Sequence, residues 1–111
     1  DVFVYTTLYE NFGQPMAEAA ASGLPLVATP TGVAPELVGN DAGFLVPFHD
    51  AIATATALQT LYLSPEHYER CRLTAQHRAA REFRWATIGQ RYCQLYTEIT
   101  ERNKPKALCY G

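Results

Sequence analysis

Residues 8–32 read LYENFGQPMAEAAASGLPLVATPTG, and this stretch decides the fold. Two carboxylates, Glu10 and Glu18, stand on either side of a Phe-Gly-Gln-Pro sequence. Pro15 suits the first turn of a helix, because the N–H that proline lacks would have no partner there. The alanine-rich residues after it favour a helix, and Gly23 can end that helix in the left-handed conformation. The stretch therefore predicts a short helix with an acid on each side of its beginning.

Apolar runs precede and follow this helix. Residues 1–7, 24–29 and 43–46 are short and apolar, which is typical of strands buried in a parallel sheet. Residues 34–38 predict another short helix, with Pro35 in its first turn. Strands that alternate with helices indicate an α/β fold with right-handed crossovers. Because a complete doubly wound domain has about six strands, we expect the C-terminal half of a Rossmann-like parallel sheet with about three strands, followed by several helices.

From Asp50 onward the pattern is helical only. Asp50 can cap a helix over residues 51–63, and Ser64 followed by Pro65 can begin the next one. The apolar stripe expected on the first of these helices is Ile52, Ala55, Leu58 and Tyr62. The stripe expected on the second is Tyr68, Cys71, Ala75 and Ala79. The last helix, expected to end at Lys104-Pro105, shows Trp85, Ile88, Tyr92, Leu95 and Ile99 on one face.

The composition limits the class of protein. With 111 residues, 48% hydrophobic and 18% charged, the chain has the size and composition of one small globular domain. No run reaches the roughly 20 apolar residues of a membrane span. Because Asp1 already stands in an apolar run, we expect a fragment of a longer protein. Three widely spaced cysteines, Cys71, Cys93 and Cys109, favour free thiols in a reducing compartment, and no secretory leader is visible, so a cytoplasmic location is predicted.

Charge is divided unevenly along the chain. Residues 1–69 hold eight acidic residues and no Lys or Arg, whereas residues 70–111 hold all nine Lys and Arg residues and three acidic ones. The basic residues fall at helical spacings, which indicates a solvated helix face and not a nucleic-acid surface. No His or Cys has the spacing of metal ligands, so no metal site is predicted.

The two acids have a chemical interpretation if the fold prediction holds. In such sheets, ligands bind outside the carboxyl ends of the strands, where Glu10 would lie. Gly13 permits close approach of the backbone, and the helix beginning near Gln14 offers free N–H groups to phosphate oxygens. A carboxylate at Glu18 can accept both hydroxyls of a ribose. A nucleotide or nucleotide-sugar would fit, although the spacing alone also fits two ordinary surface or helix-dipole acids.

A wider pattern resembles the signature of retaining glycosyltransferases of family 4, which have the GT-B fold. The similarity covers nearly the whole chain up to about residue 99. The matching parts are residues 10–18 (ENFGQPMAE), 19–23 (AAASG), 24–29 (LPLVAT), Gly32, 35–38 (PELV), 43–47 (GFLVP) and 83–85 (FRW).

The resemblance implies that residues 1–111 are a partial nucleotide-sugar-binding domain, with its upstream half and an N-terminal acceptor domain absent. It implies transfer of a sugar from a nucleoside-diphosphate sugar with retention of configuration, and with no metal or other cofactor. Glu10 would be the catalytic carboxylate beside the transferred sugar, and Glu18 would hold the ribose. Further donor contacts are expected from the backbone around Phe12, Gly13, Gln14 and Met16.

Other consequences of the resemblance concern what the chain lacks. Arg and Lys for the diphosphate would come from upstream, so the isolated fragment is expected to be inactive. The acceptor, whether saccharide, lipid or small molecule, stays open, and the absent domain could make a peripheral membrane contact. The last helix would cross to that domain, so part of its apolar face, from Trp85 to Tyr96, is expected to be exposed.

Three alternatives remain from the residues alone. A non-catalytic transferase-like module would bind a partner or a nucleotide without chemistry. A sugar-nucleotide epimerase shares the GT-B architecture. A hydride-transfer enzyme is disfavoured, because no GxGxxG follows a strand.

Overall fold

A computed structural model describes residues 1–103, which form a parallel sheet with helices on both faces. The strands are β1 (Phe3–Tyr5), β2 (Leu26–Ala28) and β3 (Gly43–Leu45), in the spatial order β1-β2-β3. The helices are α1 (Gln14–Ala21), α2 (Ala34–Val38), α3 (Ala51–Leu63), α4 (Pro65–Glu82) and α5 (Trp85–Arg102). Both strand pairs are parallel, with Val27 opposite Val4 and Phe44. The predicted α/β fold is therefore confirmed.

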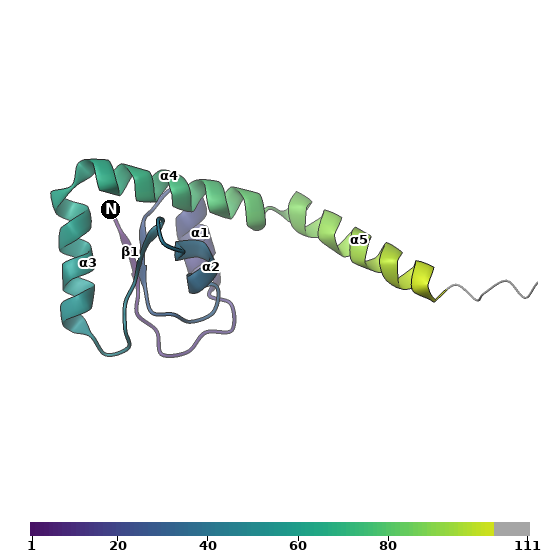
Figure 1. Cartoon of the computed structure of the whole chain (residues 1–111), viewed down its shortest axis with the longest axis horizontal. Coiled ribbons are helices and arrows are strands. Elements are labelled where there is room, and N and C mark those ends of the chain that lie inside the picture. Colours follow the sequence, from purple (N-terminus) through teal and green to yellow (C-terminus); the bar gives the residue numbers. More distant parts are fainter. Residues whose placement is uncertain (104–111) are drawn as a thin grey trace, which may run out of the picture.

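The central strand β2 is buried on both faces, and this arrangement forms two apolar cores. Leu26 and Ala28 pack on one face with residues of α1, α2 and α4, while Val27 packs on the other with residues of α3 and α4. Successive strand residues point to opposite faces, which explains why one short run contributes to both cores. Figure 1 shows α3 on one side of the sheet and α1 and α2 on the other, with α4 running across both.

Helix α1 begins and ends where its sequence predicts. Gly13, with φ of 87°, precedes it, and Pro15 lies in its first turn. Gly23, with φ of 80°, follows its end. Met16 and Ala20 are fully buried on the side that faces the core. The small side chains of α1 let it pack closely against α4.

The apolar stripe expected on α3 is wrong for three of its four residues, since only Leu58 packs partly buried against the core. Ile52 is 81% exposed and Tyr62 is 85% exposed, whereas Ala57 and Leu61 are buried. The helix is apolar or weakly polar nearly all round, so its pattern does not define one inward face. Ala57 and Leu61 pack with Val27 of the sheet, while Ile52 and Tyr62 are left in solvent.

Arg78 of α4 joins this helix to the end of α2. Its Nη1 donates to the carbonyl oxygens of Leu37 at 2.8 Å and Val38 at 3.0 Å, and its Nη2 pairs with Asp41 at 2.6 Å. The last carbonyls of a helix have no partner within it, and a cation there also suits the helix dipole. Arg78 therefore satisfies the end of α2 and fixes α4 over it.

Helix α5 extends away from the α/β body (Figure 1), and none of its described residues is buried. As expected, its apolar face is largely exposed, with Trp85 at 85%, Tyr92 at 55% and Tyr96 at 61%. Arg91 of α5 pairs with Glu82 of α4 at 2.6 Å across the junction. Within residues 1–103, no helix is both long and apolar enough to cross a membrane. The expected helix end at Lys104-Pro105, and Cys109, lie outside the described residues.

We predict that Arg78→Met lowers the free energy of unfolding by about 1.5–3 kcal/mol, because charged hydrogen bonds to the end of α2 are lost. Arg70→Met, on the same helix, is the matched control: among residues 1–103, Arg70 bonds only to Glu66 and His67 of its own helix, on the exposed surface. Its loss should cost no more than about 0.5 kcal/mol. Urea unfolding followed by circular dichroism measures both, and equal losses would contradict the role given to Arg78.

Candidate functional site

The loops that follow the three strands lie at one end of the sheet, because the strands are parallel. The loop after β1 and the loop after β2 are hydrogen-bonded to each other. The Val33 N–H donates to the Phe12 carbonyl at 2.7 Å, and the Thr29 hydroxyl donates to the Thr7 carbonyl at 2.5 Å. The Thr7 and Thr31 hydroxyls are 3.0 Å apart. The residues just before α1 are thus held against the second loop.

Gly32 makes this contact between loops possible. Its φ is 52°, and a Cβ built on it would lie 2.3 Å from the Phe12 carbonyl oxygen and 3.1 Å from the Glu10 Cβ. Any larger residue would push the loop after β1 away and would also be strained in this backbone conformation. Gly32 therefore sets how closely Glu10 and Phe12 approach the loop after β2.

The carboxylate of Glu10 is half-buried and has one well-defined partner. The Tyr5 hydroxyl, at the end of β1, donates to Glu10 Oε1 at 2.5 Å. This hydrogen bond is the main reason why the pKa of Tyr5 is raised above its ordinary value, since deprotonation would remove the donor. The Glu10 Cγ also lies 3.8 Å from the position that a Cβ on Gly13 would take. Glu10 is therefore placed beside the beginning of α1.

The beginning of α1 is partly available to a ligand. Gln14 is exposed, and its N–H donates to no acceptor among residues 1–103. The Met16 N–H, in contrast, donates to the Gly13 carbonyl at 3.0 Å, and the Met16 side chain is fully buried. Gln14 is thus better placed than Met16 to meet an anion through the backbone.

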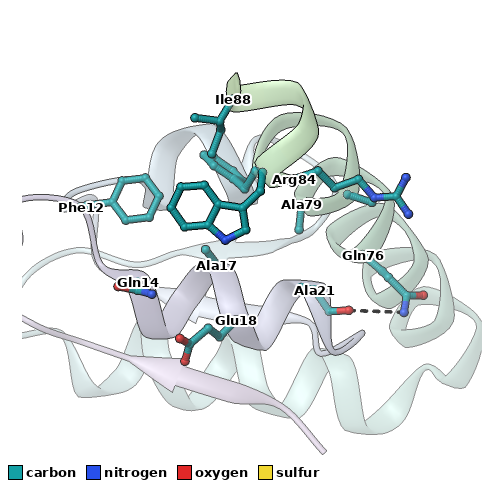
Figure 2. A pocket seen from close by; sticks show the side chains of 12 residues that line it. Phe12, Gln14, Ala17, Glu18, Ala21, Gln76, Ala79, Arg84 and Ile88 are labelled. Carbon is teal, nitrogen blue, oxygen red and sulfur yellow. Dashed lines mark hydrogen bonds between the residues drawn. The ribbon is translucent and has the colours of Figure 1, made fainter. Parts of the chain in front are cut away.

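Phe12, Gln14 and Glu18 line a cavity of about 720 Å³. One wall is the face of α1 from Gln14 to Ala21, and the other is the end of α4 with the start of α5. Phe12 meets Phe83 edge to face, with 5.6 Å between ring centroids. Figure 2 shows Gln14 and Glu18 on one side of the cavity and Arg84 on the other, toward Gln76.

Glu18 stands one turn after Gln14 on the exposed surface of α1. Its carboxylate points away from Ile88 and Arg84 in Figure 2, and it has no hydrogen-bonding partner among the residues that the structure describes. It can therefore accept hydrogen bonds from a ligand without breaking any existing contact. The expected ribose contact of Glu18 stays a prediction, as do the roles expected of Glu10, Phe12, Gly13, Gln14 and Met16.

Sequence reasoning missed two parts of this region. The sequence did not predict that Gln76 and Ala79 of α4 form a wall of the cavity. The neighbouring residues 83–85, which also line it, were matched to the family pattern without being assigned to the site. A second cavity of about 650 Å³ lies between the loop after β1 and the beginning of α3, and His49 and Thr54 line it. Across the described part of the chain, no group of three or more His, Cys, Asp or Glu residues could hold a metal ion.

Together, the parallel sheet and the helices on both of its faces define an α/β domain of the doubly wound class, in which ligands bind outside the carboxyl ends of the strands. The family model described as glycosyl transferases group 1 matches residues 1–78. The chain therefore belongs to this family, and it corresponds to the family's C-terminal region.

Similar proteins agree with this assignment. The chain is 33% identical over 104 residues to an MMP alpha-(1->4)-mannosyltransferase from Mycolicibacterium hassiacum, covering 92% of this chain and 25% of that protein. It is 36% identical over 104 residues to a D-inositol 3-phosphate glycosyltransferase from Xylanimonas cellulosilytica, covering 92% and 24%. The solved structure of sucrose-phosphate synthase from Thermosynechococcus elongatus matches with a TM-score of 0.76 and 30% identity, over 90% of this chain and 26% of that one. The chain thus spans about a quarter of each of these relatives.

We predict that Gly32→Ala destabilises the protein, since a left-handed backbone costs a non-glycine residue about 1–2 kcal/mol and the Phe12 carbonyl must also move. Gly89→Ala in α5 is the control, because a Cβ there meets nothing within 4 Å. That change should stabilise the helix by about 0.5–1 kcal/mol. Opposite shifts in melting temperature are expected, and shifts of the same sign would contradict the account of Gly32.

Proposed function

We propose that the full-length protein is a retaining hexosyltransferase that transfers a sugar from a nucleoside-diphosphate sugar to an acceptor. Residues 1–111 would supply the C-terminal part of its donor-binding domain. The observation that most supports this proposal is the placement of the Glu10 carboxylate beside the open beginning of α1. Glu18, exposed one turn into the same helix, adds a second acceptor group without a partner among the described residues.

Each residue has a defined part in this proposal. The diphosphate would lie at the beginning of α1, where the Gln14 N–H is free and the helix dipole favours anions. Glu18 would accept the ribose hydroxyls. Glu10 would stabilise the positive charge that develops at the anomeric carbon as the bond to the diphosphate breaks. Phe12, Gly13 and Met16 would shape the loop around the donor sugar.

The acceptor and the compartment belong to the proposal too. The relatives are named for different reactions, one as an MMP alpha-(1->4)-mannosyltransferase and another as a D-inositol 3-phosphate glycosyltransferase, so we leave the acceptor open. Cys71 and Cys93 are free thiols, which supports a cytoplasmic location.

We predict that, in the full-length protein, Glu10→Gln lowers kcat by about 100-fold or more, because a charge aimed at the transition state is removed. Glu18→Gln should instead raise the donor KM about tenfold or more, because hydrogen bonds to a charged group are weakened. Glu36→Gln is the matched control, since Glu36 is an exposed acid in the first turn of α2. Release of nucleoside diphosphate from UDP-glucose, GDP-mannose and ADP-glucose measures all three.

Two results would contradict the proposal. If Glu10→Gln behaves as Glu36→Gln does, Glu10 has no part in the chemistry. If the full-length protein binds a nucleotide but releases nothing from any donor, with or without added acceptors, the chain belongs to a non-catalytic transferase-like module.

We further predict that residues 1–111 alone are inactive and bind a sugar nucleotide with a Kd of about 1 mM or weaker, where the binding free energy is only about −4 kcal/mol. The reason is electrostatic, since residues 1–69 contain no Lys or Arg to face the diphosphate. Titration calorimetry with the three donors named above tests this. Nanomolar binding would show that the fragment holds a complete donor site.

A further inference from the structure

Tyr5 is the last residue of β1 and precedes the loop that contains Glu10. Its ring packs with the core on the α1 side of the sheet and stacks on Phe3, with centroids 5.6 Å apart and planes 19° apart. Its backbone pairs with Ala28 of β2. The pairing of the strand and the packing of the ring on the core therefore restrict where the hydroxyl can lie.

That hydroxyl is the one hydrogen-bond donor to the Glu10 carboxylate among residues 1–103. Its distance of 2.5 Å to Oε1 falls in the short range of bonds between a hydroxyl and a carboxylate. Oε2 accepts no hydrogen bond from the described residues. The stem of Glu10 lies close to Gly13 and Gly32: a Cβ on Gly13 would be 3.8 Å from the Glu10 Cγ, and one on Gly32 would be 3.1 Å from the Glu10 Cβ. The stem thus lies beside two glycines, and the Tyr5 hydroxyl holds the head group.

We propose that Tyr5 is a positioning residue that orients the Glu10 carboxylate toward the transferred sugar. With Oε1 held by Tyr5, Oε2 is the oxygen left to face the substrate. This inference rests on the catalytic part proposed for Glu10. A glutamate side chain free to rotate spends only part of its time in the productive orientation, and fixing it in advance is what makes a charge effective in the transition state.

The neighbouring Tyr9 provides a control of the same chemistry. Its hydroxyl donates to the Asn11 side chain at 2.6 Å, in the same loop, and Tyr9 is 77% exposed. Tyr5→Phe and Tyr9→Phe each remove one hydroxyl and one hydrogen bond, and only the first removes a contact to Glu10. In Tyr5→Phe the ring and its packing on Phe3 are retained.

The test uses the full-length protein, with release of nucleoside diphosphate from UDP-glucose, GDP-mannose or ADP-glucose as the assay. We expect Tyr5→Phe to lower kcat about 10- to 100-fold, as misplaced catalytic groups do, with donor KM within about twofold of the parent protein. Tyr9→Phe should leave both constants unchanged. The two variants should have equal melting temperatures, which separates positioning from loss of fold.

A double-mutant cycle shows whether Tyr5 acts through Glu10. Glu10→Asp keeps the charge but withdraws the carboxylate from the Tyr5 hydroxyl, so Tyr5→Phe should cause no further loss of kcat in that background. An equal loss in both backgrounds, or equal losses for Tyr5→Phe and Tyr9→Phe, would overturn the inference. If Glu10→Gln lowers kcat but Tyr5→Phe does not, the positioning role alone fails. If Glu10→Gln has no effect, the proposed function of Glu10 fails and the positioning role fails with it.

Discussion

The contact between Gly32 and the Phe12 carbonyl, with the hydrogen bond from the Val33 N–H beside it, is the constraint on which the candidate site depends. It joins the loops after β1 and β2, which are separate turns in the sequence. Because a Cβ at position 32 would lie 2.3 Å from the Phe12 oxygen, the loops can approach so closely only at a glycine. This approach holds Glu10 and Phe12, which precede α1, against the loop after β2.

Helix α4 holds the layers together, because it contacts both cores. Cys71 packs in the core with Val27 and α3, and Ala75 and Ala79 pack in the core with α1 and α2. Arg78, between these positions, satisfies the end of α2. The same helix then forms one wall of the cavity next to Glu18, so the element that stabilises the fold also bounds the candidate site.

Much of the site could be predicted from local sequence. The acids at positions 10 and 18, the glycine before α1 and the proline in its first turn are all close in the chain, and helix geometry relates Pro15 to Glu18 directly. The α4 wall of the cavity could not be found in this way, because it comes from residues about 60 positions later. The hydrogen bond from Tyr5 to Glu10 was missed as well. From the sequence, a tyrosine in an apolar strand cannot be told from other core aromatic residues. Its hydrogen bond to Glu10 depends on the position of the loop after β1, which only the tertiary structure shows.

The sequence by itself determined the alternation of strands and helices, the ends of α1, and the caps of α3 and α4, because turn residues, caps and buried strands depend on short-range sterics and hydrogen bonds. Only the tertiary structure decided which face of α3 is buried. Its side chains are nearly uniform in polarity, so close packing of Ala57 and Leu61 on the sheet outweighed the larger residues Ile52 and Tyr62. Tertiary packing likewise set the orientation of the Glu10 carboxylate, because its partner and its neighbouring glycines come from different loops and strands.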